Sequence, residues 1–328
     1  MKTAVHLLII LFALSASCRF GTTGTYVNDN IPAAEKAAIG TLDAQVVAAM
    51  LANDYEALSA VFAPALVEKS GMGFRENLPQ IAEQITSPQF EYLDQYYVAN
   101  STSGLANSVL SGVEGAEDYL IRYEARNQEM FISLLLLRSR HDEYLLTNIY
   151  GKYPEGWKLN ILQLGRYSYH GKNAPAYYAE AQTAYEKGHL MDAANYMMLS
   201  AQLAKPANKF WRYQREEDFR TFYDQVRKEG AAAHTLPKTI TDLHPAPQIV
   251  SIYPMCVDEG CFPMVEYLTQ IDVADTTELK RENDALHAII GNHFTGLDKD
   301  KAFLLYKTFN TLPEANTPVA TYGFVQEL

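Results

Sequence analysis

Three side chains of one predicted strand have the types and the spacing for acid–base chemistry. Tyr92, Asp94 and Tyr96 alternate along residues 90–98, and alternate residues of a strand share one face. An aspartate between two aromatic rings would lose hydration, which raises its pKa and suits it to moving a proton. In the other interpretation the face is an exposed sheet margin, where Asp94 is solvated and the tyrosines favour the extended backbone. We prefer the margin, so the three residues are candidates for ligand binding and Asp94 is kept as a candidate general base.

Two cysteines are spaced for a disulfide across a hairpin. Cys256 and Cys261 enclose a turn-forming Asp-Glu-Gly, and the flanks on both sides are strand-like. Such a hairpin would bring the two Cα atoms within about 5.5 Å of each other. A zinc site is the less favoured alternative, because no second Cys or His pair with ligand spacing lies nearby. We therefore expect a disulfide in an oxidising compartment, with no metal and no other cofactor.

The histidines give neither a catalytic dyad nor a set of metal ligands. His141 and Asp142 are adjacent in a predicted polar hairpin turn, and adjacent residues of a strand point apart. His287 and His293 lie on one predicted helix but off a common face. We interpret these histidines as structural or surface residues.

The N-terminus has the pattern of an export signal. Lys2 precedes an unbroken apolar run, Leu7–Leu14, and the small residues 15–17 lead to Cys18. The run is too short to cross a bilayer, which takes about 20 helical residues. The segment resembles a bacterial lipobox, whose cysteine carries lipid, although Ser15 stands where a large aliphatic residue is usual.

By this resemblance Cys18 is lipidated and anchors the chain in the membrane. Arg19 follows it, where inner-membrane lipoproteins have an aspartate, so the outer membrane is favoured, facing the periplasm or the cell surface. A signal peptide that is simply cleaved is the alternative.

Length and charge limit the organisation and the partners. The chain has 328 residues, more than one core usually serves, so two or three domains are expected. Its 39 acidic and 27 basic residues give a net charge of −12, with no basic cluster. A nucleic-acid backbone would be repelled, so no nucleic-acid partner is expected.

Hydrophobic periodicity predicts helices first and a meander of strands after them. The predicted helices are residues 33–51, 55–62 and 74–85, and the predicted strands are residues 90–98, 118–126, 130–138, 143–150 and 156–164. This order is typical of an α+β layer fold with an antiparallel sheet.

The stretch Met50–Pro64 resembles the opening of nuclear transport factor 2-like domains, and Glu155–Ile161 is similar to their last strand. The resemblance covers residues 33–167 and implies the cone-shaped fold shared with ketosteroid isomerase and polyketide cyclases. In enzymes of that family a carboxylate in the cone is the base and a tyrosine stabilises an enolate. Many members only bind ligands or proteins, so the resemblance says more about the fold than about the function.

Two further segments follow the meander. Pro175 opens a helix that Gly188 ends, and a second helix runs from residue 190 to Pro206, a hairpin similar to one tetratricopeptide unit. A third helix is predicted over residues 209–228. After a linker at residues 230–247, a disulfide hairpin, a helix over residues 276–293 capped by Asp275, and strands over residues 302–309 and 321–326 complete the chain.

Tyrosine is frequent, with 22 residues, and four of them cluster where the sheet should meet the helical hairpin: Tyr167, Tyr169, Tyr177 and Tyr178. A glycan-binding surface would use such side chains. Packing between the sheet and the hairpin is the preferred interpretation.

The predicted organisation has five parts: a signal peptide (1–17), a lipidated flexible tether (18–31), the cone-shaped α+β domain (32–168), the helical hairpin with a third helix (169–234) and a small α+β domain of hairpin, helix and hairpin (235–328). We expect a non-enzymatic, lipid-anchored protein of the cell envelope that binds a partner protein or small ligand through the cone. The alternatives are an isomerase- or cyclase-like enzyme with Asp94 as the base, and an assembly or scaffold factor that docks through the helical hairpin.

Overall fold

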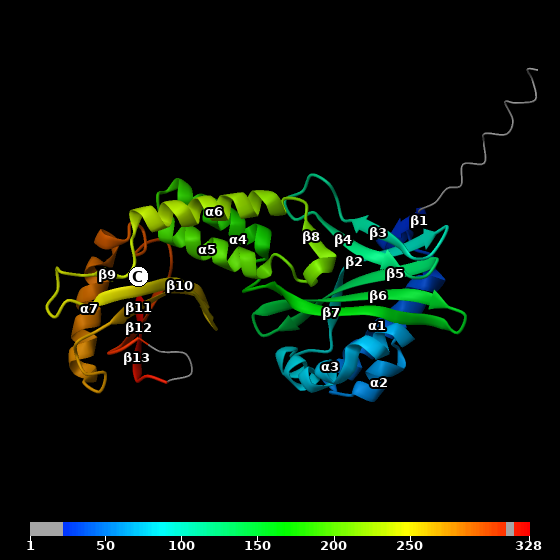
Figure 1. Cartoon of the computed structure of the whole chain (residues 1–328), viewed down its shortest axis with the longest axis horizontal. Coiled ribbons are helices and arrows are strands. Elements are labelled where there is room, and N and C mark those ends of the chain that lie inside the picture. Colours follow the sequence, from blue (N-terminus) through cyan, green and yellow to red (C-terminus); the bar gives the residue numbers. More distant parts are fainter. Residues whose placement is uncertain (1–21, 313–317) are drawn as a thin grey trace, which may run out of the picture.

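The computed structural model describes residues 22–312 and 318–328, without the side chains of residues 69–73. The fold is α+β, with sheets that are antiparallel at every pair of strands but one. Figure 1 shows two β-rich parts, with helices α4–α6 running along the top between them. Among the described residues no helix is long and apolar enough to cross a membrane.

The first part is built on a five-stranded sheet in the order β1-β2-β5-β6-β7. Its strands are Thr22–Val27, Phe90–Asn100, Glu129–Ser139, Asp142–Tyr153 and Gly156–Ser168. The side chains of β5 are buried on both faces because both faces of the sheet are covered, as its nearly unbroken apolar run predicts.

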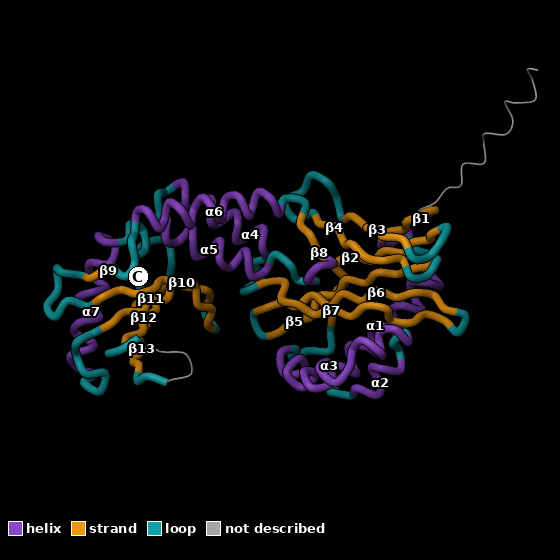
Figure 2. Tube along the Cα trace, in the orientation of Figure 1, coloured by secondary structure: helices purple, strands orange, loops and turns teal. Residues whose placement is uncertain are grey.

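Helices cover one face of this sheet (Figure 2). They are α1 (Ala33–Leu51), α2 (Tyr55–Ala60) and α3 (Pro64–Gln84). Helix α1 has the predicted bounds, whereas α3 begins ten residues before the predicted start at Phe74, because Pro64 fits the first turn of a helix.

The opposite face packs against a three-stranded sheet in the order β3-β4-β8 and against the helical hairpin. The strands are Leu105–Leu110, Tyr119–Ala125 and Trp211–Tyr213. The prediction of a helix from residue 209 is wrong at its start, because Trp211 lies in β8 and stacks on Tyr119 with ring centroids 3.9 Å apart. Helix α6 spans Glu216–Ala233.

The predicted flexible tether is also wrong for the part that the structure describes. Strand β1 pairs antiparallel with β2, and Tyr26 stacks on Tyr97 with centroids 5.7 Å apart. Alternation in a short, threonine-rich strand is weak, so edge pairing rather than local sequence decides its structure. The signal peptide and Cys18 lie outside the described residues.

The helical hairpin joins the two parts. Helices α4 (Ala174–Glu186) and α5 (Leu190–Leu203) meet at Gly188, whose φ of +76° is the left-handed conformation that ends a helix. Of the tyrosine cluster, Tyr167, Tyr177 and Tyr178 are buried in the core between sheet and hairpin, as the packing interpretation expects.

The C-terminal part has a second five-stranded sheet, in the order β13-β12-β11-β10-β9, with α7 (Thr276–His293) on one face. Its strands are Lys238–Thr239, Gln248–Val257, Gly260–Leu268, Phe303–Phe309 and Thr321–Glu327, numbered β9 to β13. Helix α7 makes the crossover from β11 to the parallel strand β12. Asp275 caps α7 by accepting the N–H of Glu278, as predicted.

Candidate functional site

A large cleft lies beside the edges of two strands in the N-terminal part. Strand β7 ends its sheet. Strand β4 pairs with β3 along one side, but on its other side no described strand pairs with it beyond Ile121, where its pairing with β8 stops. Helix α3 closes one side, and the volume of the cleft is about 1150 Å³, room for a ligand of moderate size. Seventeen residues line it: Phe62, Leu66, Phe74, Gly104, Ala106, Asn107, Ser108, Arg122, Tyr123, Glu124, Arg126, Asn160, Ile161, Leu162, Gln163, Lys209 and Phe210.

Aromatic and aliphatic side chains form the apolar part of the cleft. Phe62 is held beside β7 because the neighbouring backbone groups of Val61 and Ala63 hydrogen-bond to Leu159, at 2.8 and 2.9 Å. Phe74 packs edge-on against Phe62, with centroids 6.3 Å apart. This wall offers an apolar surface to the hydrophobic portion of a ligand.

The polar part of the cleft is cationic. Arg122, Arg126 and Lys209 line it, and none of them forms an ion pair within the described residues. Glu124 is the one carboxylate among the described lining residues. Because the whole chain carries a net charge of −12, three unpaired cations around an apolar wall are a local reversal of its charge.

One lining residue, Tyr123, has a buried hydroxyl. The side chain of Tyr123 is 5% exposed, and its hydroxyl has no hydrogen-bond partner among the described residues. Burial raises the pKa of this phenol, so the proton stays on the hydroxyl at neutral pH. Tyr123 is therefore a hydrogen-bond donor that the fold leaves unsatisfied.

Two asparagines of the lining are fixed by their neighbours. Asn160 donates to Asn127 at 3.0 Å and accepts from the hydroxyl of Tyr153 at 2.8 Å. Asn107 donates to Asn100 at 2.9 Å. These contacts hold the amides in one orientation before any ligand arrives.

The structure does not bring the three predicted site residues together. A β-bulge at Leu93 interrupts the pairing of β2 with β5 between Tyr92 and Asp94. Because a bulge inserts one residue into the alternation, Tyr92 lies on the helix-covered face and Asp94 and Tyr96 on the other. The prediction of a shared face is therefore wrong for Tyr92, and none of the three lines the cleft.

Asp94 is instead the acceptor of a structural network. Its carboxylate accepts from Asn28 at 2.8 Å, from Tyr96 at 3.2 Å and from the hydroxyl of Tyr119. Asn28 also accepts the backbone N–H of Gln95 at 2.8 Å, so these contacts tie the segment after β1 to β2 and β4. Asp94 is therefore neither a solvated residue of a sheet margin nor a carboxylate that is free to contact a substrate.

Sequence reasoning missed a second carboxylate, Asp43 of α1. It is fully buried and accepts from Tyr150 at 2.7 Å, Asn148 at 2.8 Å and Tyr92 at 3.1 Å. Burial raises its pKa, and the hydrogen bonds from Asn148 and Tyr150 oppose this effect. The available signal was its position four residues after Ile39 and three before Val46, on the apolar stripe of α1.

Asp43 is sealed and lines none of the clefts found in the described residues. Its carboxylate fastens α1 to the sheet through β2 and β6. It has the raised pKa of a catalytic acid but not the access, so the structure assigns it a packing role.

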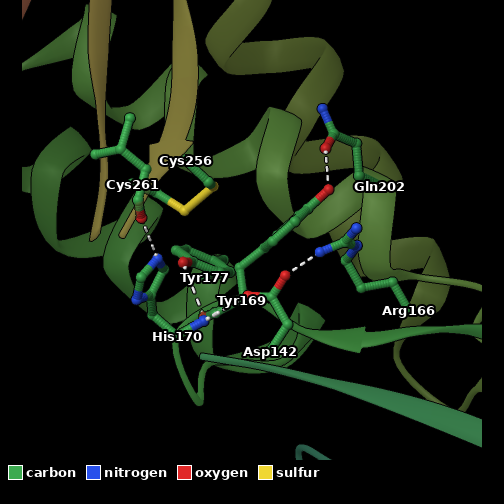
Figure 3. The surroundings of a disulfide bond; sticks show 9 residues. Asp142, Arg166, Tyr169, His170, Tyr177, Gln202, Cys256 and Cys261 are labelled. Atoms are coloured by element: carbon green, nitrogen blue, oxygen red, sulfur yellow. Dashed lines mark hydrogen bonds and ion pairs between the residues drawn. A yellow bond between two sulfur atoms is a disulfide. The ribbon is translucent and has the colours of Figure 1, made fainter. Parts of the chain in front are cut away.

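A disulfide joins Cys256 and Cys261 at the tip of the β10–β11 hairpin (Figure 3). The tip rests on the segment between β7 and α4, where the Nε2 atom of His170 lies 2.8 Å from the carbonyl oxygen of Val257. Asp142 and Arg166 form an ion pair beside it. These contacts make the region a junction between the two β-rich parts.

Three further histidines contact protein groups. His141 stacks on His170 with centroids 5.2 Å apart, the Nδ1 atom of His287 lies 3.0 Å from the hydroxyl of Tyr306, and His293 lies 2.9 Å from Asp242. Within the described residues no group of three His, Cys, Asp or Glu side chains is placed to hold a metal ion.

Comparison with known proteins adds little to this geometry. No protein-family model matches the chain, and no curated protein matches it. One solved structure is similar over 40% of this chain and 94% of its own: it is described as a dehydratase of the NTF2-like family from Streptomyces avermitilis, with 14% sequence identity and a TM-score of 0.21. At that TM-score we draw nothing from the likeness about reaction or ligand.

Proposed function

We propose that this protein is a non-enzymatic binding protein of the cell envelope whose N-terminal cleft takes an amphipathic anion. The ligand would have an apolar chain or ring system and a carboxylate, phosphate or sulfate head group. The envelope location rests on the export signal and on Cys18.

The observation that carries this proposal is the pairing of charge and apolar surface in one cleft. Phe62, Leu66 and Phe74 give the apolar wall, and three cations without ion-pair partners in the described chain lie at the same opening. Arginine presents several donors in a planar fork that matches a carboxylate or phosphate.

Two features support binding rather than catalysis. Both oxygens of Asp94 already accept hydrogen bonds from the protein, and Asp94 lies outside the cleft. Asp43 is completely buried. A general base has to come within hydrogen-bond reach of the proton it removes, which neither carboxylate does in this arrangement.

The proposal can be tested with three ligands that share a dodecyl chain and differ in head group. Dodecanoate, dodecyl maltoside and dodecyltrimethylammonium, each below its micelle concentration, are titrated into the protein by isothermal calorimetry. We expect binding in that order, with the anion at least about tenfold tighter than the cation, a difference of about 1.4 kcal/mol. Equal affinity for all three, or no binding of dodecanoate, would contradict the proposal.

A further inference from the structure

Strand β13 has a free outer edge with no feature that would block pairing with another strand. It is the last strand of the C-terminal sheet, and no described strand pairs with its free side. Edge strands are usually guarded by proline, by lysine or by a bulge, because their free N–H and C=O groups invite another strand. Strand β13 reads Thr-Tyr-Gly-Phe-Val-Gln-Glu, without proline or lysine, and pairs with β12 in unbroken register.

Apolar side chains of this edge are unusually exposed. Val325 is 68% exposed and Tyr322 37% exposed. Tyr322 packs against Phe324 with ring centroids 5.0 Å apart, so the two rings form a continuous aromatic surface. Aromatic surface of this kind is typical of the centre of binding interfaces.

A groove of about 690 Å³ runs between this edge and α7. Residues of both elements line it: Thr276, Thr277, Lys280, Arg281, Asp284, Tyr322, Gly323, Phe324, Val325 and Gln326. The amide of Gln326 donates to Asn283 and Asp284, both at 2.8 Å, and so fixes the strand to the helix at one end of the groove. The groove combines an open strand edge with a helix beside it.

The charges of the groove favour an acidic occupant. Lys280 is exposed and has no ion pair among the described residues, and Arg281 is paired only with the exposed Glu278. Asp284 is the one carboxylate in the described lining, and it already accepts from Gln326. Two cations on one side of a free strand edge match carboxylates of an extended chain.

The same charges oppose a second copy of this chain. Antiparallel pairing of β13 with its copy needs a two-fold axis perpendicular to the sheet, which leaves both α7 helices on one face beside each other. Lys280 and Arg281 would then approach their own copies across that axis. Like charges placed together lower the affinity of such a pairing.

We propose that an acidic, extended segment of a partner protein adds a strand to β13 and places its carboxylates on Lys280 and Arg281. Main-chain hydrogen bonds along β13 would supply affinity, and the aromatic pair and the two cations would select the side chains. This site is independent of the N-terminal cleft and of the ligand proposed for it.

The first test selects peptides from a phage-displayed library of random peptides about 12 residues long, the length that an edge strand and its flanks can contact. The protein used for the selection contains both β-rich parts. We expect selected peptides rich in Asp and Glu, with apolar residues between them. The absence of any enriched acidic pattern would overturn the proposal.

The second test uses charge variants against one selected peptide. The double variant Lys280→Glu with Arg281→Glu should weaken its binding at least about tenfold. The matched control is Arg227→Glu with Lys228→Glu on α6, also an exposed Arg-Lys pair whose arginine is bound to an acid three residues earlier. The control should bind within about twofold of the unaltered chain, a difference of less than about 0.5 kcal/mol. Equal weakening in both double variants would contradict a specific site.

The third test asks whether the peptide binds as a strand. Two versions of it are N-methylated at alternate residues, one at odd and one at even positions. Because successive N–H groups of a strand point to opposite edges, only one version should lose affinity. Loss or retention of binding in both versions would reject strand addition. A dimer of the free protein that disappears when a lysine is placed in the edge strand by Val325→Lys, measured by sedimentation, would assign the edge to a second copy instead.

Discussion

The ammonium group of Lys301 lies 2.9 Å from the carboxylate of Asp192, and the two side chains are only 6% and 5% exposed. Lys301 precedes β12 and Asp192 is in the first turn of α5, so the pair fastens the C-terminal part to the helical hairpin. The ammonium also donates to the carbonyl oxygens of Leu297 and Gly296, at 2.9 and 3.0 Å. A lysine that is satisfied by one carboxylate and several carbonyl groups holds one geometry.

Removal of Lys301 alone should therefore leave the buried carboxylate of Asp192 without its partner. We expect Lys301→Met to lower the free energy of unfolding by about 3–5 kcal/mol, because Asp192 keeps its desolvation without its partner. The double variant with Asp192→Leu should recover much of this loss. Urea denaturation of the three chains measures the effect, and a loss of under about 1 kcal/mol in Lys301→Met would show that the pair is solvated.

Asp94 should behave as a structural acceptor. Asp94→Asn replaces one acceptor oxygen by an amide that meets the hydroxyl donors of Tyr96 and Tyr119, so we expect a loss of about 1–3 kcal/mol in unfolding free energy. Affinity for dodecanoate should not change, because Asp94 lies outside the cleft. Thermal unfolding and calorimetry of this variant test both statements. Lost affinity with unchanged stability would restore Asp94 to the ligand site.

Helices α1 and α7 show which elements can be predicted from the sequence. The elements whose apolar period or cap is strong were predicted well: α1 has the expected bounds, and α7 begins at the predicted cap, Asp275. These signals are local, because a cap and a helical stripe depend on residues within one or two turns.

The candidate site could not be predicted in this way. A bulge adds one residue to a strand without leaving a mark in the alternation of side chains, so the sequence alone does not separate Tyr92 from Asp94. The cleft depends on residues far apart in the sequence, such as Phe62 and Arg122, which come together only when two sheet edges face each other. Trp211 joins β8 rather than the following helix because pairing with β4 outweighs local helical preference.

The buried Asp43 predicts a pH dependence of stability. Its pKa in the folded protein is raised above 3.8, so the folded chain binds more protons than the unfolded chain between the two pKa values. The contribution of Asp43 is therefore fully present below pH 3.8 and is lost as the pH rises through the folded pKa. Unfolding free energies of the unaltered chain and of Asp43→Asn, compared from acid to neutral pH, should show this fall only in the former. A difference between the two chains that stays constant with pH would contradict it.

Cys18 should carry the membrane anchor. Metabolic labelling with a clickable palmitate analogue should tag the protein, and Cys18→Ser should lose the tag and move to the soluble fraction. The acyl chains on Cys18 would hold the protein in the membrane, because each buried methylene contributes about 0.8 kcal/mol. Release should therefore follow loss of the lipidated cysteine. Unchanged membrane partition of Cys18→Ser would contradict lipid anchorage at this position.

Charge variants at the opening of the N-terminal cleft test whether its cations bind the ligand. The double variant Arg122→Gln with Arg126→Gln removes two of the three cations and leaves the apolar wall intact. The matched control is Arg227→Gln with Lys228→Gln on the exposed face of α6. Calorimetric titration with dodecanoate should show affinity at least about tenfold lower in the cleft variant and within about twofold of the unaltered chain in the control. Equal affinity in all three proteins would contradict the account, because the anion would then bind elsewhere or without the cations.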